Sequence, residues 1–315
     1  MDFMDFMDFM TNLYDLAIIG AGPAGLSASI YASRYGIKNV VIGGIAGGLT
    51  TQTHEIGNWL GNEKIKGWEF ANNAAEHVKS YGTEVLPLLV DEVKKEGEDF
   101  SLLVSDGRKI QAKTVLLAMG TKHRHLGVPG EKEFAGKGVS YCAICDGFFY
   151  KGKTVAVVGG NDSAAGAAVF LGDIAEKVYM IYRGEKLRSE AFWGEAIAKN
   201  PKIEKVFITN IKEIKGSEKV EEIVLDNPYK GSEVLKVDGI FAEIGSDPMT
   251  ELIKDLGIEL DEEGYIKIDS SGRTNERGVW AAGDITTGSD KFKQIITAAS
   301  EGSIAAHSIQ KFLKK

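Results

Sequence analysis

Short apolar runs alternate with glycine-rich turns and helical patterns along this chain. Near the N-terminus, residues 16–19 form an apolar run, residues 20–25 a glycine-rich turn, residues 26–35 a helical pattern and residues 40–42 a second apolar run. The order strand, turn, helix, strand predicts a βαβ unit.

A near copy of this pattern occurs later in the chain. An apolar run at residues 154–158 leads to Gly159-Gly160, then to a helix rich in small residues that continues to Leu171, and then to a second run at residues 178–182. The sequence therefore predicts two nucleotide-binding halves, one in each of two domains.

The other predicted elements lie between and after these halves. Helices are expected at residues 68–81, 191–199, 249 onward and 294–312, and strands at 115–118, around Val206, and at 220–225, 237–244 and 278–282. Glycine and proline cluster at residues 120–128 and 245–248, where we expect the chain to cross between domains.

These positions predict an α/β fold with two Rossmann-like dinucleotide-binding domains, the second inserted into the first. The expected first domain is discontinuous and contains residues 13–121 and 247–315. The expected second domain contains residues 122–246, and residues 1–12, a Met-Asp-Phe repeat, form an N-terminal extension.

Composition narrows the function classes. The chain has 315 residues, 43% of them hydrophobic, and a formal net charge of −8. A negative chain offers no basic face to nucleic acid or anionic lipid, and no apolar run reaches the roughly 18 residues of a spanning helix. Two cysteines without a recognisable secretion signal predict a cytoplasmic protein without a lasting structural disulfide.

The first glycine-rich turn has the dinucleotide-binding spacing. Gly20, Gly22 and Gly25 follow an apolar strand and open a helix. The first glycine permits the tight turn, the second lets the backbone approach a pyrophosphate, and the third lets the helix pack on the strand. The second strand ends in Ile42-Gly43-Gly44 without the acidic residue that usually holds the ribose.

The second turn departs from this spacing. Gly159 and Gly160 are followed by Asn161 where the middle glycine is expected. Asparagine tolerates left-handed backbone, so we expect the turn to survive with a weaker phosphate contact. Arg183 and Arg188 follow the next strand and suit the 2′-phosphate of NADP, although both could simply be solvated surface residues.

The two cysteines form a Cys-x-x-Cys motif just before the second βαβ unit. The spacing of Cys142 and Cys145 permits a small disulfide ring and commonly lowers the pKa of one thiol. Asp146 could transfer a proton, or could simply form a turn with Gly147. Inert core cysteines or a zinc site shared with His123 and His125 are alternatives, but the spacing favours a redox pair without a metal.

The chain resembles the low-molecular-weight thioredoxin reductases over roughly residues 14–313. The resemblance is carried by these segments: Gly20-x-Gly22-x-x-Gly25, Gly47-Gly48 to Gly61 with Asn58-Trp59, Ala118-Met119-Gly120, Gly138 through Cys142-Ala143-Ile144-Cys145-Asp146, and Ala282-Gly283-Asp284. The cysteine segment is the most specific, because related flavin disulfide reductases carry their cysteines in the flavin domain.

The resemblance implies a homodimer with FAD in the discontinuous domain and a nicotinamide cofactor, NADPH, in the inserted one. It implies that Cys145 faces the flavin, Cys142 attacks the disulfide of thioredoxin or a similar small dithiol protein, and Asp146 acts as the acid. The implied FAD residues are Gly20, Gly22, Ala24, Gly25, Gly47, Gly48, Leu49, Asn58, Gly120, Gly283, Asp284, Lys293 and Gln294. The implied NADP residues are Gly159, Gly160, Asn161, Asp162, Ser163, Arg183 and Arg188.

The departures from the family pattern concern the electron donor. Gly166-Ala167 replaces a pair of glutamates, and Tyr182-Arg183-Gly184 replaces His-Arg-Arg. Some relatives with altered motifs here use reduced ferredoxin or deazaflavin. The sequence thus predicts a thioredoxin-disulfide reductase, with a ferredoxin- or deazaflavin-dependent reductase, a flavin-dependent dithiol oxidase and a nucleotide-binding redox sensor as alternatives. Family members rotate one domain against the other, and the glycine-rich crossings suit such a hinge.

Overall fold

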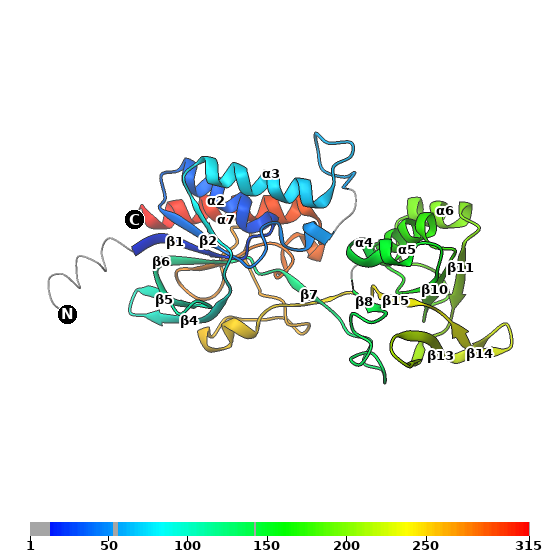
Figure 1. The fold of residues 1–315 in the computed structure, drawn as a ribbon. Coiled ribbons are helices and arrows are strands. Elements are labelled where there is room, and N and C mark those ends of the chain that lie inside the picture. The colour runs from blue at the N-terminus through cyan, green and yellow to red at the C-terminus, as the bar shows by residue number, and fades with distance from the viewer. Residues whose placement is uncertain (1–12, 53–55, 142, 315) are drawn as a thin grey trace. The chain divides into compact units, whose positions relative to one another are not determined.

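The chain folds into two compact units (Figure 1). The computed structural model describes residues 13–52, 56–141 and 143–314. Unit 1 extends to Lys122 and resumes at Pro248, whereas unit 2 runs from His123 to Asp247. Unit 2 is therefore inserted into unit 1, and both divisions lie one residue beyond the expected ones. The N-terminal repeat at residues 1–12 lies outside the described residues.

Unit 1 is built on a seven-stranded sheet with the order β3-β2-β1-β6-β5-β4, in which β17 also pairs with β6. Its strands are β1 (Leu13–Ile19), β2 (Asn39–Ile42), β3 (Glu84–Leu86), β4 (Val90–Glu96), β5 (Asp99–Val104), β6 (Lys109–Leu117) and β17 (Val279–Ala281). The pairs β1–β2, β2–β3, β1–β6 and β6–β17 are parallel, whereas β4, β5 and β6 form an antiparallel meander. The βαβ prediction for residues 16–42 is confirmed.

Three long helices lie along one face of this sheet (Figure 1). They are α2 (Pro23–Arg34), α3 (Gly67–Ser80) and α7 (Ile295–Leu313), and short 3₁₀ turns occur at η1 (Gly48–Gln52), η3 (Glu251–Leu256) and η4 (Gly288–Lys291). Helix α2 starts with a proline, whose fixed φ suits a first turn. Helix α7 starts with a capping box in which the Gln294 and Thr297 side chains each bond the other residue's backbone. Helices α2 and α7 approach closely because Gly302 has no Cβ to meet the carbonyl oxygen of Ala24.

Unit 2 is built on a five-stranded parallel sheet with the order β11-β10-β9-β15-β8. Its strands are β8 (Val139–Ser140), β9 (Thr154–Val158), β10 (Lys177–Tyr182), β11 (Ile203–Phe207) and β15 (Gly239–Ala242). The helical elements are α4 (Ala143–Asp146), η2 (Gly147–Tyr150), α5 (Asp162–Ile174) and α6 (Ala191–Lys199). A separate antiparallel sheet contains β12 (Ile211–Gly216), β13 (Val220–Tyr229) and β14 (Ser232–Lys236).

Two apolar cores hold unit 2 together. One contains the small residues of α5, such as Ala164 and Ala168, packed with Val157 and Phe241 of the parallel sheet. The other joins that sheet to the antiparallel one. Unit 2 therefore has the predicted βαβ unit and its own hydrophobic core, so the Rossmann-like fold class is confirmed for both units.

The chain passes between the units within two paired strands, β7 (Thr121–His123) and β16 (Ser246–Pro248). The helix predicted from Met249 is wrong in its start and type, because the backbone N–H of Met249 donates to the carbonyl of Gly120 at 3.1 Å. Only the short η3 follows, and the left-handed Gly257, with φ of 66°, ends it. The other predicted helices and strands are present with slightly shifted ends.

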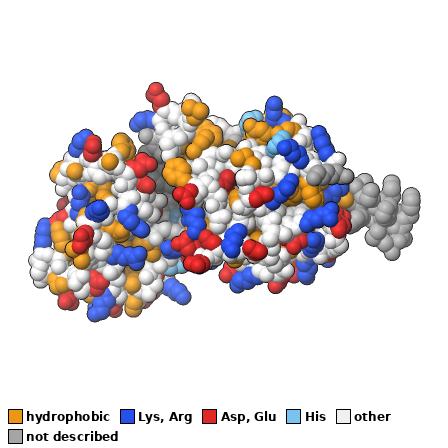
Figure 2. Space-filling model, turned by 180° about the vertical axis from the view of Figure 1, so that it is seen from behind, with side chains coloured by type: hydrophobic (Ala, Val, Ile, Leu, Met, Phe, Trp, Pro, Cys, Tyr) orange, Lys and Arg blue, Asp and Glu red, His pale blue; other side chains and the backbone are white. Residues whose placement is uncertain are grey.

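Figure 2 shows lysine, arginine, aspartate and glutamate side chains mixed over the face that it displays. Among the described residues, none of the helices combines the length and apolar character that crossing a bilayer requires.

Candidate functional site

The first phosphate turn, residues 20–25, has the geometry that its glycines predict. Gly20 has a φ of +113°, and a Cβ there would lie 2.1 Å from the carbonyl oxygen of Ala118 in the chain leaving β6. A Cβ on Gly25 would lie 1.9 Å from the carbonyl oxygen of Gly20. Gly22 differs, because nothing lies within 4 Å of its Cβ position. Two glycines are thus needed for packing, and the third leaves open space beside the start of α2.

Other predicted flavin residues converge on this turn. A Cβ on Gly48 would lie 3.4 Å from the Cα of Gly22, and a Cβ on Gly283 would lie 2.9 Å from the Cβ of Ala24. The backbone N–H of Gly47 donates to the carbonyl of Ala21 at 2.6 Å. Leu49 follows in η1, and Gly120 follows β6. Segments distant in sequence therefore meet at the carboxyl ends of the parallel strands, where open α/β sheets bind ligands.

Two further predicted residues meet each other in unit 1. The amide of Asn58 donates to the side-chain oxygen of Gln294, the N-cap of α7, at 2.9 Å. Lys293 donates to the hydroxyl of Tyr265. Burial raises the pKa of Asp284, while the positive charge of Lys293 opposes that rise. Asp284 and Lys293 therefore lie close enough to interact electrostatically.

Glu301 holds the Gly283 loop and was not predicted from the sequence. Its carboxylate accepts hydrogen bonds from the backbone N–H of Gly283 at 2.8 Å and from the hydroxyls of Thr286 at 3.0 Å and Ser289 at 2.6 Å. In the sequence Glu301 is a lone acidic residue in α7, and a single charge does not indicate which residues it contacts.

The open space at Gly22 tests whether unit 1 fits a dinucleotide. The N-cap of α2 has no side-chain hydrogen bond and no acidic residue in its first turn. The first amides of a helix lack intrahelical partners and attract anions. A pyrophosphate fits a turn that has free amides, no side chain in the way and converging backbone loops. The residues present in unit 1 fit FAD.

The second phosphate turn, residues 159–164, follows the same path but is filled differently. Asn161 has a φ of −93° and a ψ of −177°, so its backbone is extended and needs no left-handed conformation. Its side-chain oxygen instead accepts a hydrogen bond from the backbone N–H of Ala164 at 3.0 Å. Asparagine at an N-cap satisfies a helix-end amide in this way. The Asn161 side chain thus already accepts the backbone N–H of Ala164, which could otherwise donate to a phosphate.

The neighbouring NADP candidates lie around this turn. The backbone N–H of Arg188 donates to the carbonyl of Gly160 at 2.7 Å, and its guanidinium lies 6.0 Å from the ring centroid of Tyr182. The carboxylate of Asp162 accepts from the backbone N–H of Glu190 at 2.7 Å. Arg183 and Ser163 are exposed. Arg188 is therefore fixed beside the turn through its backbone, and no contact joins it to Arg183 in the described residues.

The dithiol segment packs against the same helix. Cys142 lies outside the described residues, whereas Cys145 belongs to α4. Gly147, directly after α4, fits against α5, since a Cβ there would lie 2.8 Å from the ring of Phe170. Asp146 is partly buried and helps to raise the pKa of Tyr150, for which burial is the larger cause. Helix α4 and Gly147 thus adjoin α5, the helix that follows the second phosphate turn.

A buried carboxylate anchors the segment before the dithiol. Glu131 is 2% exposed. It accepts hydrogen bonds from the backbone N–H groups of Leu126 and Gly127, each at 2.7 Å, and from the hydroxyl of Tyr141 at 2.7 Å. The hydrogen bond to Glu131 and burial raise the pKa of Tyr141. Tyr141 also lies 2.8 Å from the Nδ1 atom of His125. His125, one of the proposed zinc ligands, therefore contacts the chain just before Cys142.

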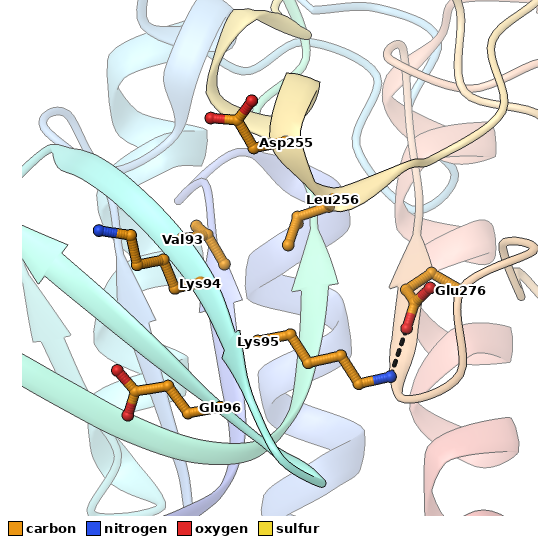
Figure 3. Close-up of a pocket in the computed structure, with 7 residues that line it drawn as sticks. All are labelled: Val93, Lys94, Lys95, Glu96, Asp255, Leu256 and Glu276. Atoms are coloured by element: carbon orange, nitrogen blue, oxygen red, sulfur yellow. Dashed lines mark hydrogen bonds and ion pairs between the residues drawn. The ribbon is translucent and has the colours of Figure 1, made fainter.

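A metal cluster and a surface hollow are two further candidates for a site. Within the described ranges, no three His, Cys, Asp or Glu side chains gather to hold a metal ion. The zinc alternative includes Cys142, outside those ranges, and so stays untested. Unit 1 also has a hollow of about 330 Å³ lined by residues of β4 and η3 and by Glu276, which forms an ion pair with Lys95 at 2.5 Å. Figure 3 shows the side chains that line it. This hollow contains none of the predicted site residues.

The fold and these two turns define a class: a two-domain protein with one dinucleotide-type turn in each unit and a dithiol segment in the second. Residues 14–302 match the family described as pyridine nucleotide-disulphide oxidoreductase. The thioredoxin reductase of Bacillus subtilis is 39% identical over 306 residues, which cover 96% of both chains.

Solved structures agree with the sequence comparison. The thioredoxin reductase of Lactococcus lactis is similar with a TM-score of 0.91 and 36% identity, over 96% of this chain and 99% of that one. The thioredoxin reductase of T. acidophilum is similar with a TM-score of 0.91 and 37% identity, over 96% of this chain and 100% of that one. This chain belongs to the thioredoxin reductases of the pyridine nucleotide-disulphide oxidoreductase family.

Proposed function

We propose that this chain is a thioredoxin-disulfide reductase that passes electrons from NADPH through FAD and the Cys142/Cys145 dithiol to a small disulfide protein. The observation that carries the proposal is the position of α4, to which Cys145 belongs: α4 and the following Gly147 pack on α5, and the phosphate turn of unit 2 precedes that helix. A reductase with two redox partners needs a site for each. The second nucleotide turn would bind the donor NADPH, and the dithiol would react with the disulfide protein.

Unit 1 would hold the flavin. The amides at the start of α2 and the backbone around Gly22 and Gly48 would bind its pyrophosphate, and Gly283, Asp284, Lys293 and Gln294 lie on the loop before α7 that would complete the site. Bound FAD would supply two-electron chemistry between hydride donor and disulfide. Glu301 would keep the Gly283 amide in place, because its carboxylate already accepts that N–H.

The thiol chemistry belongs to unit 2. Cys145 would exchange electrons with the flavin, Cys142 would attack the partner's disulfide, and Asp146 would supply a proton. Phe148 and Phe149, just beyond Asp146, are 72% and 71% exposed. Exposed aromatic side chains beside a reactive pair suit the docking of a small disulfide protein, since aromatic residues are enriched at interface centres. We also propose that the active form is a homodimer.

A second donor is favoured by one observation. Because Asn161 caps α5, the N–H of Ala164 is already satisfied before any nucleotide binds. Reduced ferredoxin or a deazaflavin would not need that amide. Arg188, in contrast, lies beside the turn and suits a 2′-phosphate, so NADPH remains the proposed donor and the other two are the alternatives.

An anaerobic titration tests the proposal. The FAD-loaded protein is mixed in turn with NADPH, NADH, reduced ferredoxin and reduced deazaflavin, and flavin bleaching is followed by absorbance. Oxidised thioredoxin is then added and its new thiols are counted. We expect NADPH to bleach the flavin and thioredoxin to be reduced, and Cys142→Ser to abolish only the second event. No thioredoxin reduction with any donor, or undiminished reduction by the variant, would contradict the proposal.

A further inference from the structure

Glu243 is an acidic residue at the carboxyl end of β15. The preceding residues Ile240 and Phe241 are fully buried and pair in parallel with Val139 and Ser140 of β8. Parallel strands end at the same edge of a sheet. Glu243 therefore leaves the sheet on the same side as the segment that follows Ser140, which is the Cys-x-x-Cys segment.

The contacts of Glu243 join that segment to the second phosphate turn. Its backbone N–H donates to the carbonyl of Val158 at 2.8 Å, and its own carbonyl oxygen would lie 2.2 Å from a Cβ on Gly159. Its carboxyl group accepts a hydrogen bond from the backbone N–H of Ala143, the residue that directly follows Cys142. One side chain thus contacts the backbone between the two cysteines.

The carboxyl group of Glu243 is partly buried. Burial raises the pKa of Glu243 to about 7, and the hydrogen bond from Ala143 only partly opposes the rise. Strands β8, β9 and β15 carry no charged side chain within their bounds. The titratable groups on the adjoining helical elements are Cys145 and Asp146 of α4, Tyr150 of η2, and Asp162 and Asp173 of α5. Among the described residues, no cationic side chain lowers the pKa of Glu243.

We propose that Glu243 exchanges protons with the dithiol during disulfide reduction, a role beyond the proton transfer expected of Asp146. The carboxyl group of Glu243 is hydrogen-bonded to the backbone N–H of Ala143, between the two cysteines in sequence, at an edge of the sheet where β8, β9 and β15 carry no charged residue. A carboxylic acid near neutral pKa can both give and take a proton at physiological pH. The inference rests on the proposed function, because it needs the Cys142/Cys145 pair to reduce a disulfide.

The proton balance is complete without another reactant. The Cys142 thiolate attacks the partner's disulfide, forming a mixed disulfide and releasing one partner thiolate, to which Glu243 gives its proton. The Cys145 thiol returns a proton to Glu243 and attacks Cys142, so that the enzyme disulfide forms and the second partner thiolate leaves. The partner gains two electrons and one proton, the dithiol loses the same, and Glu243 ends unchanged.

Glu243→Gln tests the proposal, since glutamine keeps the size of the side chain and the acceptor for Ala143 but cannot titrate. The FAD-loaded enzyme is reduced with dithionite, and its exchange with oxidised thioredoxin is followed in single turnover from pH 5.5 to 9. Below pH 7 Glu243 is protonated and can donate, whereas above pH 7 it is ionised and cannot. We expect the ratio of wild-type to variant rates to be about ten at pH 6 and to fall toward one by pH 9.

Two controls isolate the effect. Glu233→Gln removes an exposed charge of the same kind from β14 and should leave the profile unchanged. Alkylation of the reduced enzyme by iodoacetamide reads the thiols without donor or partner, and its rate in the wild type should show an inflection near pH 7 that the Glu243→Gln variant lacks. Superimposable alkylation profiles, or a rate ratio independent of pH, would overturn the role of Glu243. Failure of the wild type to reduce thioredoxin, with the alkylation difference intact, would instead overturn the proposed partner.

Discussion

The two phosphate turns have nearly the same backbone conformation at the helix N-cap and a different residue there. Gly22 has φ and ψ of −80° and −176°, and Asn161 has −93° and −177°, each as the N-cap of the helix that follows. At Gly22 the space beside the helix start is open, whereas at Asn161 the side chain bonds the amide of Ala164. The first turn needs an external anion to satisfy its amides, and the second has partly satisfied them itself.

The difference extends to the strand that follows each helix. In unit 1 the strand β2 ends at Ile42. A Cβ on the next residue, Gly43, would lie 2.6 Å from the backbone nitrogen of Ala21. In unit 2 the ring of Tyr182 fills the matching place, 2.6 Å from a Cβ position on Gly160. The residue after β2 thus contacts the first turn through its backbone, whereas an aromatic ring contacts the second turn. In unit 2 Arg188 lies beside the turn and offers a cation to a ligand phosphate.

The largest effect is expected from Gly22→Asn, which gives the first turn the side chain of the second. The backbone of Gly22 is extended, so the fold should persist, but the new side chain would enter the pyrophosphate space and cap α2. Loss of two charge-assisted hydrogen bonds of about 1.5 kcal/mol each lowers FAD affinity roughly a hundredfold. Flavin absorbance per protein measures it. Gly194→Asn, on open space in α6, is the control, and full flavin content in Gly22→Asn would refute the comparison.

A smaller effect is expected from Arg188→Ala. If the second turn binds NADPH, the guanidinium beside it should contact the 2′-phosphate, and its loss should weaken NADPH binding about tenfold while leaving NADH binding unchanged. Calorimetry with both nucleotides measures this. Lys186→Ala removes an exposed charge nearby and should change neither affinity. An equal loss for both nucleotides would show that Arg188 does not read the 2′-phosphate.

Asn161→Ala should strengthen nucleotide binding. Removing the cap frees the amide of Ala164 for a phosphate, which no longer has to replace a hydrogen bond worth about 1 kcal/mol, so NADPH affinity should rise about fivefold. Calorimetry on the oxidised, FAD-loaded protein measures the change. Weaker binding by this variant would mean that Asn161 itself contacts the nucleotide, and the contrast between the turns would be wrong.

Glycine positions were predictable because their requirements are local. The spacing of Gly20 and Gly25 is typical of a dinucleotide-binding turn. The strand before the turn and the helix after it could be identified from hydrophobic periodicity. The capping role of Asn161 was not predictable, because asparagine favours both left-handed backbone and helix N-caps, and the sequence does not separate the two.

Contacts between distant segments explain the remaining failures. Glu301 bonds the amide of Gly283, and Glu243 bonds that of Ala143, but each acidic residue is an isolated charge in its own segment. Hydrophobic periodicity predicts on which face of a helix or strand a residue lies. It does not predict which distant loop that residue contacts. The helix expected from Met249 failed for the same reason, since the backbone N–H of Met249 bonds the carbonyl of Gly120 on another segment.

The smallest expected effect is on stability at the start of α5. An N-cap asparagine replaced by glycine costs only a few tenths of a kcal/mol, whereas replacement by alanine costs about 1 kcal/mol. Amide hydrogen exchange in peptides covering residues 162–171, on FAD-loaded protein without nucleotide, should therefore be up to about fivefold faster in Asn161→Ala and nearly unchanged in Asn161→Gly. If both variants exchange at the wild-type rate, the cap does not stabilise α5, and the second turn is as open to an anion as the first.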